Sequence, residues 1–207
     1  MTLYVPPHFR QDDAELLFSF IQQNAFATLV SAGEAGLHVS HIPFVAEREA
    51  DGAVRLLGHV AIGNEQWKVL EGARDIVAIF HGPHAYVSPG WYQSHPSVPT
   101  WNYAVVHARG KARLLEEAAL HELLMRLSST YESSRDKPWR MSELPADYVN
   151  TMLKGIVGFE IEVERLEGKF KLSQNRPAEV PRVVRELERE APELARLMDE
   201  VAALPKG

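Results

Sequence analysis

The hydrophobic pattern changes from helical to strand-like early in the chain. The first apolar face repeats with helical spacing and consists of Leu16, Leu17, Phe20 and Ile21. Asp12 precedes this face with Glu15 three residues later, which predicts a capped helix. From Phe26 onward, runs rich in Val, Ile and Phe predict strands over 26–32, 37–46 and 54–60. Glycine-containing turns at 33–36 and 51–52 separate these strands.

The rest of the chain continues as strands, with a short helix predicted over 64–71 and further helices later in the chain. The predicted strands are 76–80, 84–88, 101–114, 156–163 and 169–172. Gly82 and Pro83 predict a break between the first two, and three prolines predict a loop over 89–99. Helical spacing recurs over 116–132 and from Val180, and Pro192 begins a further helix. About seven strands, mostly joined by short turns, predict an antiparallel barrel decorated by helices.

Composition and charge narrow the classes of function. The 207 residues are 45% hydrophobic and include no Cys, which excludes a thiolate nucleophile and a Cys-ligated metal. With a net charge of −6, the chain lacks the excess of Lys and Arg that is typical of DNA-binding proteins. No N-terminal signal peptide and no membrane-spanning run is expected, so the predicted location is the cytoplasm.

The densest unusual segment is the aromatic stretch over 81–103. It contains two Trp, three Tyr and several Pro residues, together with polar neighbours such as Asn102. Ring faces that stack and side chains that hydrogen-bond suit a flat conjugated ligand. These rings are equally suited to closing the end of a barrel or lining a subunit interface, and the spacing does not decide between these alternatives.

A second cluster follows at the end of the last strand. Strand alternation places Lys169 and Lys171 on one face, and the polar run Ser173-Gln174-Asn175-Arg176 comes directly after. Cations with hydrogen-bonding side chains indicate a phosphate site. The alternative is a solvated basic turn before a helix.

The rest of the chain contains few other candidate functional residues. Ser40-His41-Ile42-Pro43-Phe44 places polar residues on a strand that is otherwise apolar. His81 and His84 have near-ligand spacing but no carboxylate partner, so we expect strand-end histidines bonded to backbone and no metal site. The chain also lacks a Gly-rich phosphate loop and a nucleophile elbow.

Eight short blocks, in order, resemble those of one known family. They are Tyr4-Val5-Pro6-Pro7-His8-Phe9, Ser40-His41-Ile42-Pro43-Phe44, Gly58-His59-Val60-Ala61, Asn64-Glu65-Gln66-Trp67, Gly82-Pro83-His84-Ala85-Tyr86-Val87-Ser88, Val98-Pro99-Thr100-Trp101-Asn102-Tyr103, Lys154-Gly155-Ile156-Val157-Gly158-Phe159 and Lys171-Leu172-Ser173-Gln174-Asn175-Arg176. From residue 1 to about residue 200, the chain resembles the PaiB-type FMN-binding negative transcriptional regulators.

This resemblance implies a mainly β fold with helices, namely an FMN-binding split β-barrel with peripheral and C-terminal helices. The implied organisation is a barrel domain over 1–172, with a helical insertion at about 116–153, and a C-terminal helical segment over 173–207. That segment would pack on the barrel or on a partner subunit. In such folds two subunits form a homodimer, and the flavin lies in the cleft between them.

The resemblance also implies where the flavin is bound. Split-barrel relatives line the flavin with the strand that matches 40–44 and the turn that matches 59–64, while the aromatic block and the segment 173–176 supply the remaining walls. The implied FMN contacts are His41, Pro43, His59, Asn64, Trp101, Asn102, Tyr103, Lys171, Ser173, Gln174, Asn175 and Arg176. Lys171 and Arg176 are the candidates for the phosphate, since an acidic protein must gather cations locally.

Three functions stay open at this point. The first is an FMN-binding regulator that works as a flavin- or redox-linked sensor, since no acid–base pair or nucleophile stands out. The second is a flavin-dependent NAD(P)H oxidoreductase, in which the cofactor supplies the chemistry. The third is haem handling, because split-barrel relatives include haem-degrading proteins. Direct DNA binding is a separate question, which the acidic charge does not support.

Overall fold

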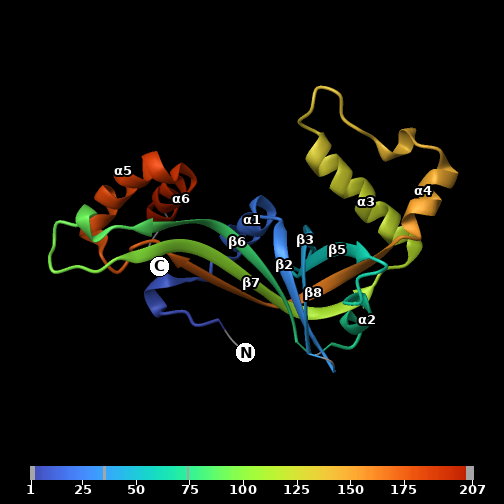
Figure 1. Ribbon diagram of the computed structural model, residues 1–207, viewed down its shortest axis with the longest axis horizontal. Helices are drawn as coiled ribbons and strands as arrows, with labels where there is room; N and C mark the ends of the chain where they lie inside the picture. The colour runs from blue at the N-terminus through green and yellow to red at the C-terminus, as the bar shows by residue number, and fades with distance from the viewer. Residues whose placement is uncertain (1–2, 35, 74, 204–207) are drawn as a thin grey trace. The chain divides into compact units, whose positions relative to one another are not determined.

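The computed structural model describes residues 3–34, 36–73 and 75–203 (Figure 1). The strands are β1 (Arg10–Gln11), β2 (Phe26–Gly33), β3 (Gly36–Pro43), β4 (Val45–Arg48), β5 (Val54–Ala61), β6 (Ile76–Val87), β7 (Thr100–Leu114) and β8 (Ile156–Lys171). The α-helices are α1 (Ala14–Gln23), α2 (Trp67–Leu70), α3 (Glu117–Glu132), α4 (Ala146–Leu153), α5 (Val180–Glu190) and α6 (Pro192–Ala202). Short 3-10 turns lie at Pro7–Phe9, Pro89–Trp91, Met141–Glu143 and Pro177–Glu179.

The strands form one mainly antiparallel sheet, so the predicted mainly β fold with helices is confirmed. Its order is β3-β2-β6-β7-β8-β5-β4, and β1 pairs with β8 beside this path. β2 pairs with both β3 and β6, and β5 pairs with both β4 and β8. The two ends of this order are not paired with each other, so the sheet is not closed.

Two predicted breaks are absent, because the strands run through them. β6 continues through Gly82 and Pro83, and β8 joins the two strands predicted at 156–163 and 169–172. At Gly82 the ring of Phe20 occupies the space that a Cβ would take, so this glycine serves close packing.

Two further expectations need correction near the N-terminus. The first helix is capped by Asp13 and not by Asp12, because the Asp13 carboxylate accepts hydrogen bonds from the backbone N–H groups of Glu15 and Leu16. The strand predicted over 37–46 is two strands, β3 and β4, separated at Phe44. The Phe44 N–H donates to the Ala25 carbonyl at 2.9 Å, which interrupts the extended run.

The chain forms two compact units, each with a core of its own. The terminal unit contains 3–20, 81–106 and 167–203, and the central unit contains the described residues of 21–80 and 107–166. In the terminal unit, the rings of Phe20 and Phe170 lie 5.0 Å apart, centroid to centroid. In the central unit, the Phe44 ring packs edge-on against Phe80 and Phe159 at 5.8 and 6.1 Å.

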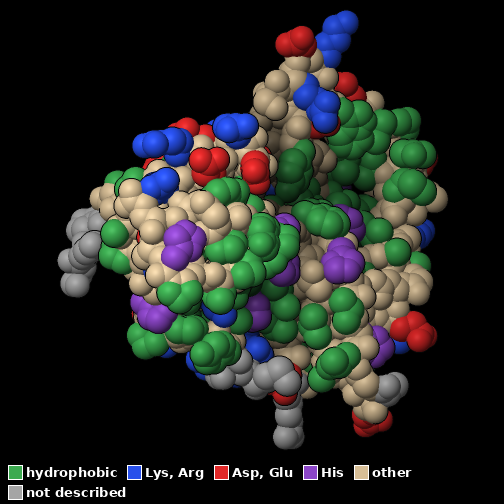
Figure 2. Space-filling view, turned by 60° about the vertical axis from the view of Figure 1, so that its left-hand side comes forward, with side chains coloured by type: hydrophobic (Ala, Val, Ile, Leu, Met, Phe, Trp, Pro, Cys, Tyr) green, Lys and Arg blue, Asp and Glu red, His purple; other side chains and the backbone are tan. Residues whose placement is uncertain are grey.

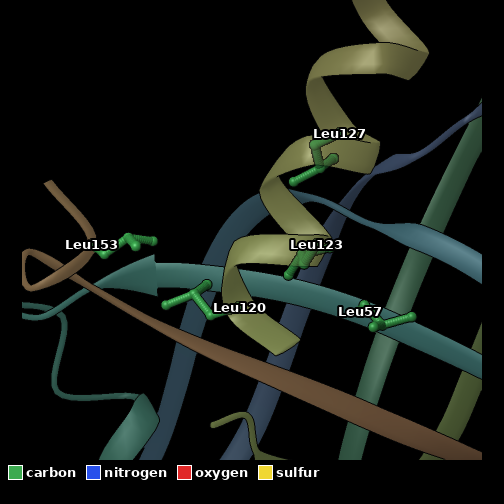
Figure 3. Close-up of a cluster of buried hydrophobic side chains, with 5 residues drawn as sticks. All are labelled: Leu57, Leu120, Leu123, Leu127 and Leu153. Carbon is green, nitrogen blue, oxygen red and sulfur yellow. The ribbon is translucent and has the colours of Figure 1, made fainter. Parts of the chain in front are cut away.

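A cluster of leucines holds α3 and α4 in the central unit. Leu120, Leu123 and Leu127 of α3 form one cluster with Leu57 of β5 and Leu153 of α4, and Figure 3 shows these five side chains. The spacing of the three α3 leucines is that of a single helical face. The predicted helical segment therefore packs by hydrophobic burial on the sheet. Within the described residues, no helix is long and apolar enough to cross a membrane.

Replacing Leu123, which is almost fully buried, by Ala should lower the free energy of unfolding by about 2–5 kcal/mol, because it leaves a cavity among the leucines. Urea unfolding followed by circular dichroism measures the change. Met125→Ala on the same helix is the matched control, since Met125 is exposed and its loss should cost about 0.5 kcal/mol or less. Equal losses for both variants would contradict the packing described here.

Candidate functional site

The twelve predicted site residues fall into two groups, one in each unit. His41, Pro43, His59 and Asn64 belong to the central unit. Trp101, Asn102, Tyr103, Lys171, Ser173, Gln174, Asn175 and Arg176 belong to the terminal unit. Figure 2 shows histidine side chains at several places on the surface, with hydrophobic side chains next to them. We describe each group by itself.

The central group is organised by the turn after β5. The Asn64 amide donates to the Ser40 hydroxyl at 2.8 Å, and its carbonyl oxygen accepts from the Gln66 backbone N–H. Asn64 therefore joins the turn to β3, where Pro43 is the last residue. His41, on the exposed face of β3, has its Nδ1 3.1 Å from the Thr28 hydroxyl.

His59 has a buried ring nitrogen that the fold leaves unsatisfied. Its Nδ1 is inaccessible to solvent and has no hydrogen-bond partner among the described residues. Burial lowers the pKa of His59, so the ring is neutral at neutral pH. A buried polar atom without a partner is uncommon in proteins and requires an explanation. A hydroxyl or phosphate oxygen of a bound molecule is one group that would satisfy it.

Gln66 has a structural role that the sequence reasoning missed, although it lies in one of the family blocks. Its side-chain N–H₂ donates to the carbonyl of Leu29 at 3.3 Å, the hydroxyl of Ser31 at 3.1 Å and the carbonyl of His38 at 3.2 Å. The residue is almost fully buried and attaches the start of α2 to β2 and β3. Nothing in the sequence distinguishes Gln66 from an exposed glutamine, because its acceptors are distant in the chain.

In the terminal unit, β7 and β8 present two different faces. Asn102, Phe170 and Leu172 point to the buried face. The alternate residues Trp101, Tyr103, Lys169 and Lys171 lie on the opposite face. We call that surface the ring–lysine face; it also includes Tyr4, His84 and Tyr86, through their contacts with Lys169 and Trp101.

Lys171 is held in place by the neighbouring strand. Its ammonium donates to the Trp101 carbonyl at 2.7 Å and to the Thr100 hydroxyl, and it lies 5.9 Å from the Phe9 ring centre. Burial, followed by the charge of Lys169, lowers the pKa of Lys171. The two partly buried ammonium groups repel each other, so the binding of an anion beside them would be favourable.

The polar run after β8 makes internal contacts that shape a tight turn. Asn102 donates to the Ser173 hydroxyl at 2.9 Å, and both side chains are buried. The Gln174 amide accepts from the Leu172 N–H at 2.7 Å and donates to the Phe170 carbonyl at 2.5 Å. Ser173 has a φ of 66°, in the left-handed region. The polar atoms of Asn102, Ser173 and Gln174 thus position the end of β8.

Arg176 and Asn175 lie beyond this turn. Asn175 is exposed. The Arg176 guanidinium donates to the Ser97 hydroxyl at 2.9 Å and lies 4.9 Å from the Tyr92 ring centre. Arg176 therefore contacts the loop before β7, whereas Lys171 contacts β7 itself.

Glu179 is the second anchor of that loop, and the sequence reasoning missed it. Its buried carboxylate accepts hydrogen bonds from the Gln93 N–H at 2.9 Å, the Ser94 N–H at 3.0 Å and the Ser94 hydroxyl at 2.7 Å. These hydrogen bonds lower the pKa of Glu179. The sequence indicates that the backbone N–H groups of this loop need acceptors, but it does not point to Glu179 as the residue that supplies them.

The histidines do not gather as metal ligands. Across the described ranges, no group of three or more His, Asp or Glu side chains is arranged to hold a metal ion. The His84 ring nitrogen Nδ1 lies 3.3 Å from the Gly82 carbonyl, so the expected backbone contact is present. His84 lies inside β6, however, and not at a strand end as the sequence suggested.

Comparison with known proteins identifies the family. A family model described as "Putative FMN-binding domain" matches residues 3–165. The chain belongs to this family of FMN-binding domains. "Protease synthase and sporulation protein PAI 2" of Bacillus subtilis (strain 168) is 38% identical over 203 residues, covering 96% of this chain and 97% of that protein. The resemblance to the PaiB type is thereby confirmed.

Solved structures show the same fold at low sequence identity. The FAD and haem binding protein from Mycobacterium smegmatis matches with a TM-score of 0.60 at 17% identity, covering 79% of this chain and 73% of that one. The flavocytochrome Anf3 from Azotobacter vinelandii matches with a TM-score of 0.58 at 18% identity, covering 81% and 72%. These neighbours have split-barrel folds, so the predicted split β-barrel is confirmed.

The residues present suit the FMN that the family binds. The cofactor has a flat ring system, a hydroxylated chain and a phosphate, and each needs a different partner. Exposed rings and two cations lie together on the ring–lysine face, and His59 has an unsatisfied buried nitrogen. Aromatic faces, cations and a polar acceptor or donor are the groups that hold such a molecule.

Glu179→Gln should destabilise the protein in a pH-dependent way. Because the folded-state pKa of Glu179 lies below its ordinary value of 4.5, its contribution is complete above that value and is lost as the pH falls through the folded-state pKa. The difference in unfolding free energy between wild type and variant should therefore be largest near neutral pH and shrink toward zero in acid. Urea titrations at several pH values measure it.

Glu188→Gln is the matched control for this experiment, since Glu188 is an exposed residue of α5, the helix that directly follows Glu179. Its effect should be small at every pH. A wild-type advantage over Glu179→Gln that does not change with pH would refute the role given to the ionised carboxylate.

Proposed function

We propose that this protein is an FMN-binding homodimer of the PaiB type that works in the cytoplasm as a flavin- or redox-linked negative regulator. The observation that carries the proposal is the coincidence of an FMN-binding family with a surface of exposed rings and lysines on β7 and β8. The regulatory part is supported by likeness to a protein named for protease synthesis and sporulation.

The flavin contacts follow from the chemistry of each side chain. Trp101 and Tyr103 stack against the flat ring, while Lys171 and Arg176 bind the phosphate. His41, Pro43, His59 and Asn64 of the central unit are kept as flavin contacts by the family resemblance, and the buried nitrogen of His59 offers a hydrogen-bonding group to a polar atom of the cofactor. Asn102, Ser173 and Gln174 act by positioning, since their polar atoms are already bonded within the fold, and Asn175 is free to reach the ligand from solvent.

A sensor is favoured over an enzyme by the residues around these rings. Bound FMN supplies electron-transfer chemistry, so the protein has only to bind and orient it. We find no paired carboxylates or activated nucleophile among the predicted contacts. With a net charge of −6, the regulator acts on transcription through a partner and not through a basic DNA-binding face.

Dimerisation is supported by an apolar sheet face in the central unit. Phe26 of β2 and Leu37 and Val39 of β3 are 67%, 74% and 56% exposed. They share one face, because β2 and β3 pair with Ala32 opposite Leu37 and Val30 opposite Val39. Large apolar side chains clustered on an edge of a sheet are typical of a surface covered by a partner. A second copy of this chain is the occupant that we propose.

The cofactor proposal is tested by titrating the protein with FMN and riboflavin. Replacing Lys171 and Arg176 together by Ala should weaken FMN binding about tenfold or more, because only FMN carries the phosphate. Riboflavin binding should change by about twofold or less. Flavin fluorescence quenching measures both affinities. Lys111→Ala, an exposed strand lysine of the central unit, is the control.

Two results would count against this assignment. Equal losses for FMN and riboflavin would place the phosphate elsewhere. Wild-type protein that binds neither flavin would overturn the cofactor role altogether. Steady oxidation of NADPH that depends on added FMN would instead favour the oxidoreductase over the sensor.

The dimer is tested by placing a charge on the apolar sheet face. Val39→Glu should convert the dimer to a monomer, because a carboxylate buried without a partner in an interface is strongly unfavourable. Size-exclusion chromatography with light scattering gives the mass. Met152→Glu in α4, which is similarly exposed at 53%, should leave the mass unchanged. A wild-type protein that is monomeric at micromolar concentration would refute the homodimer.

A further inference from the structure

Two exposed rings of the ring–lysine face, Tyr4 and Tyr86, are not among the proposed flavin contacts. Tyr4, Tyr86 and Trp101 are 80%, 45% and 53% exposed, and they come from the N-terminal arm, β6 and β7 of the terminal unit. β6 and β7 are neighbours in the sheet, and Tyr4 joins this face through its contact with Lys169 of β8. Exposed rings on adjacent strands form a platform on which successive flat groups can stack.

The rings contact one another and the two lysines. The Trp101 ring centre lies 6.2 Å from both His84 and Tyr86. The Lys169 ammonium lies 5.3 Å from the ring centres of Tyr4 and Tyr103. Cations and ring faces therefore alternate over a short distance, so that a ligand with alternating negative and flat groups would meet both.

The charge on this face is not neutralised by the fold. In the described part of the chain, no carboxylate forms an ion pair with Lys169 or Lys171, although the next residue on the same face of β8 is Glu167. Among the residues that the structure describes, the Lys171 ammonium hydrogen-bonds to uncharged oxygens alone, those of Thr100 and Trp101. Two lysines side by side attract an anionic chain locally, even in a protein of net charge −6.

We propose that the ring–lysine face binds single-stranded nucleic acid, with bases stacked on Trp101, Tyr86 and Tyr4 and backbone phosphates at Lys169 and Lys171. This goes beyond the proposed flavin function, although Trp101, Tyr103 and Lys171 are common to both. The low number of cations predicts modest affinity and little dependence on sequence, because stacking on rings tolerates every base. The paired arrangement of duplex bases does not offer their faces to such a platform.

The experiment titrates fluorescein-labelled oligo-dT and oligo-rU of about a dozen nucleotides into the full chain and measures anisotropy at several salt concentrations. Two phosphate contacts predict a slope of log K against log salt of about −1.4. Removing one lysine by Lys169→Gln should reduce the slope to about −0.7. Trp101→Ala should weaken binding about tenfold or more at every salt concentration.

Matched controls distinguish binding at the ring–lysine face from nonspecific binding elsewhere on the protein. Lys111→Gln and Trp139→Ala change an exposed lysine and an exposed tryptophan of the central unit, and neither should alter affinity or slope. Comparison of oligo-dT with oligo-rU shows whether the bound strand is DNA or RNA. A duplex of the same length should bind at least tenfold more weakly.

Several results would overturn the proposal. These are no binding of either oligonucleotide at low salt, equal effects of the control variants, or tighter binding of the duplex. FMN affinity measured on the same variants keeps the two proposals apart. If Lys171→Gln weakens FMN binding while no oligonucleotide binds, the flavin proposal stands and this one fails. If oligonucleotides bind as predicted and FMN does not, the reverse holds.

Discussion

The alternation of side chains along β7 and β8 is the constraint on which the terminal unit depends. At the terminal-unit ends of these strands, Asn102 and Phe170 are buried, while the neighbouring Trp101, Lys169 and Lys171 lie on the other face. A shift of one residue in β8 would bring Lys169 and Lys171 into the core and expose Phe170, which burial energies forbid. The buried hydrogen bond between Asn102 and Ser173 fixes the same alignment from the inside, because its loss would leave two buried polar groups unsatisfied.

The loop before β7 depends on that alignment in turn. It leaves β6 after Val87 and returns at Thr100, with its backbone attached to Glu179 and its Ser97 hydroxyl to Arg176. Both anchors follow the turn that ends β8. The position of Trp101 is therefore set by residues about 75 positions later in the chain, and the cation that stacks on Tyr92 is also the one that holds the loop.

Much of the fold follows from local pattern, whereas the contacts at the site do not. Period-two runs predicted the strands, and the leucine spacing predicted α3, because burial of one face is a property of the segment alone. Gly82 was misinterpreted as a break, since its reason for being glycine is the Phe20 ring, 62 positions earlier in the chain. The family blocks drew attention to Ser173 and Gln174, but not to their internal bonding. Gln66 and Glu179 were missed because their partners lie far away in sequence.

The exposed apolar residues on β3 have a further consequence for the protein's stability. β3 is an end strand of the sheet, so its outer backbone groups and its apolar face are both open to another molecule. In the proposed dimer, folding and association would be linked, because a second copy that binds only the folded chain withdraws folded molecules from the unfolding equilibrium. Apparent resistance to denaturation would then rise with protein concentration, and dilute protein would be the state most open to aggregation through this edge.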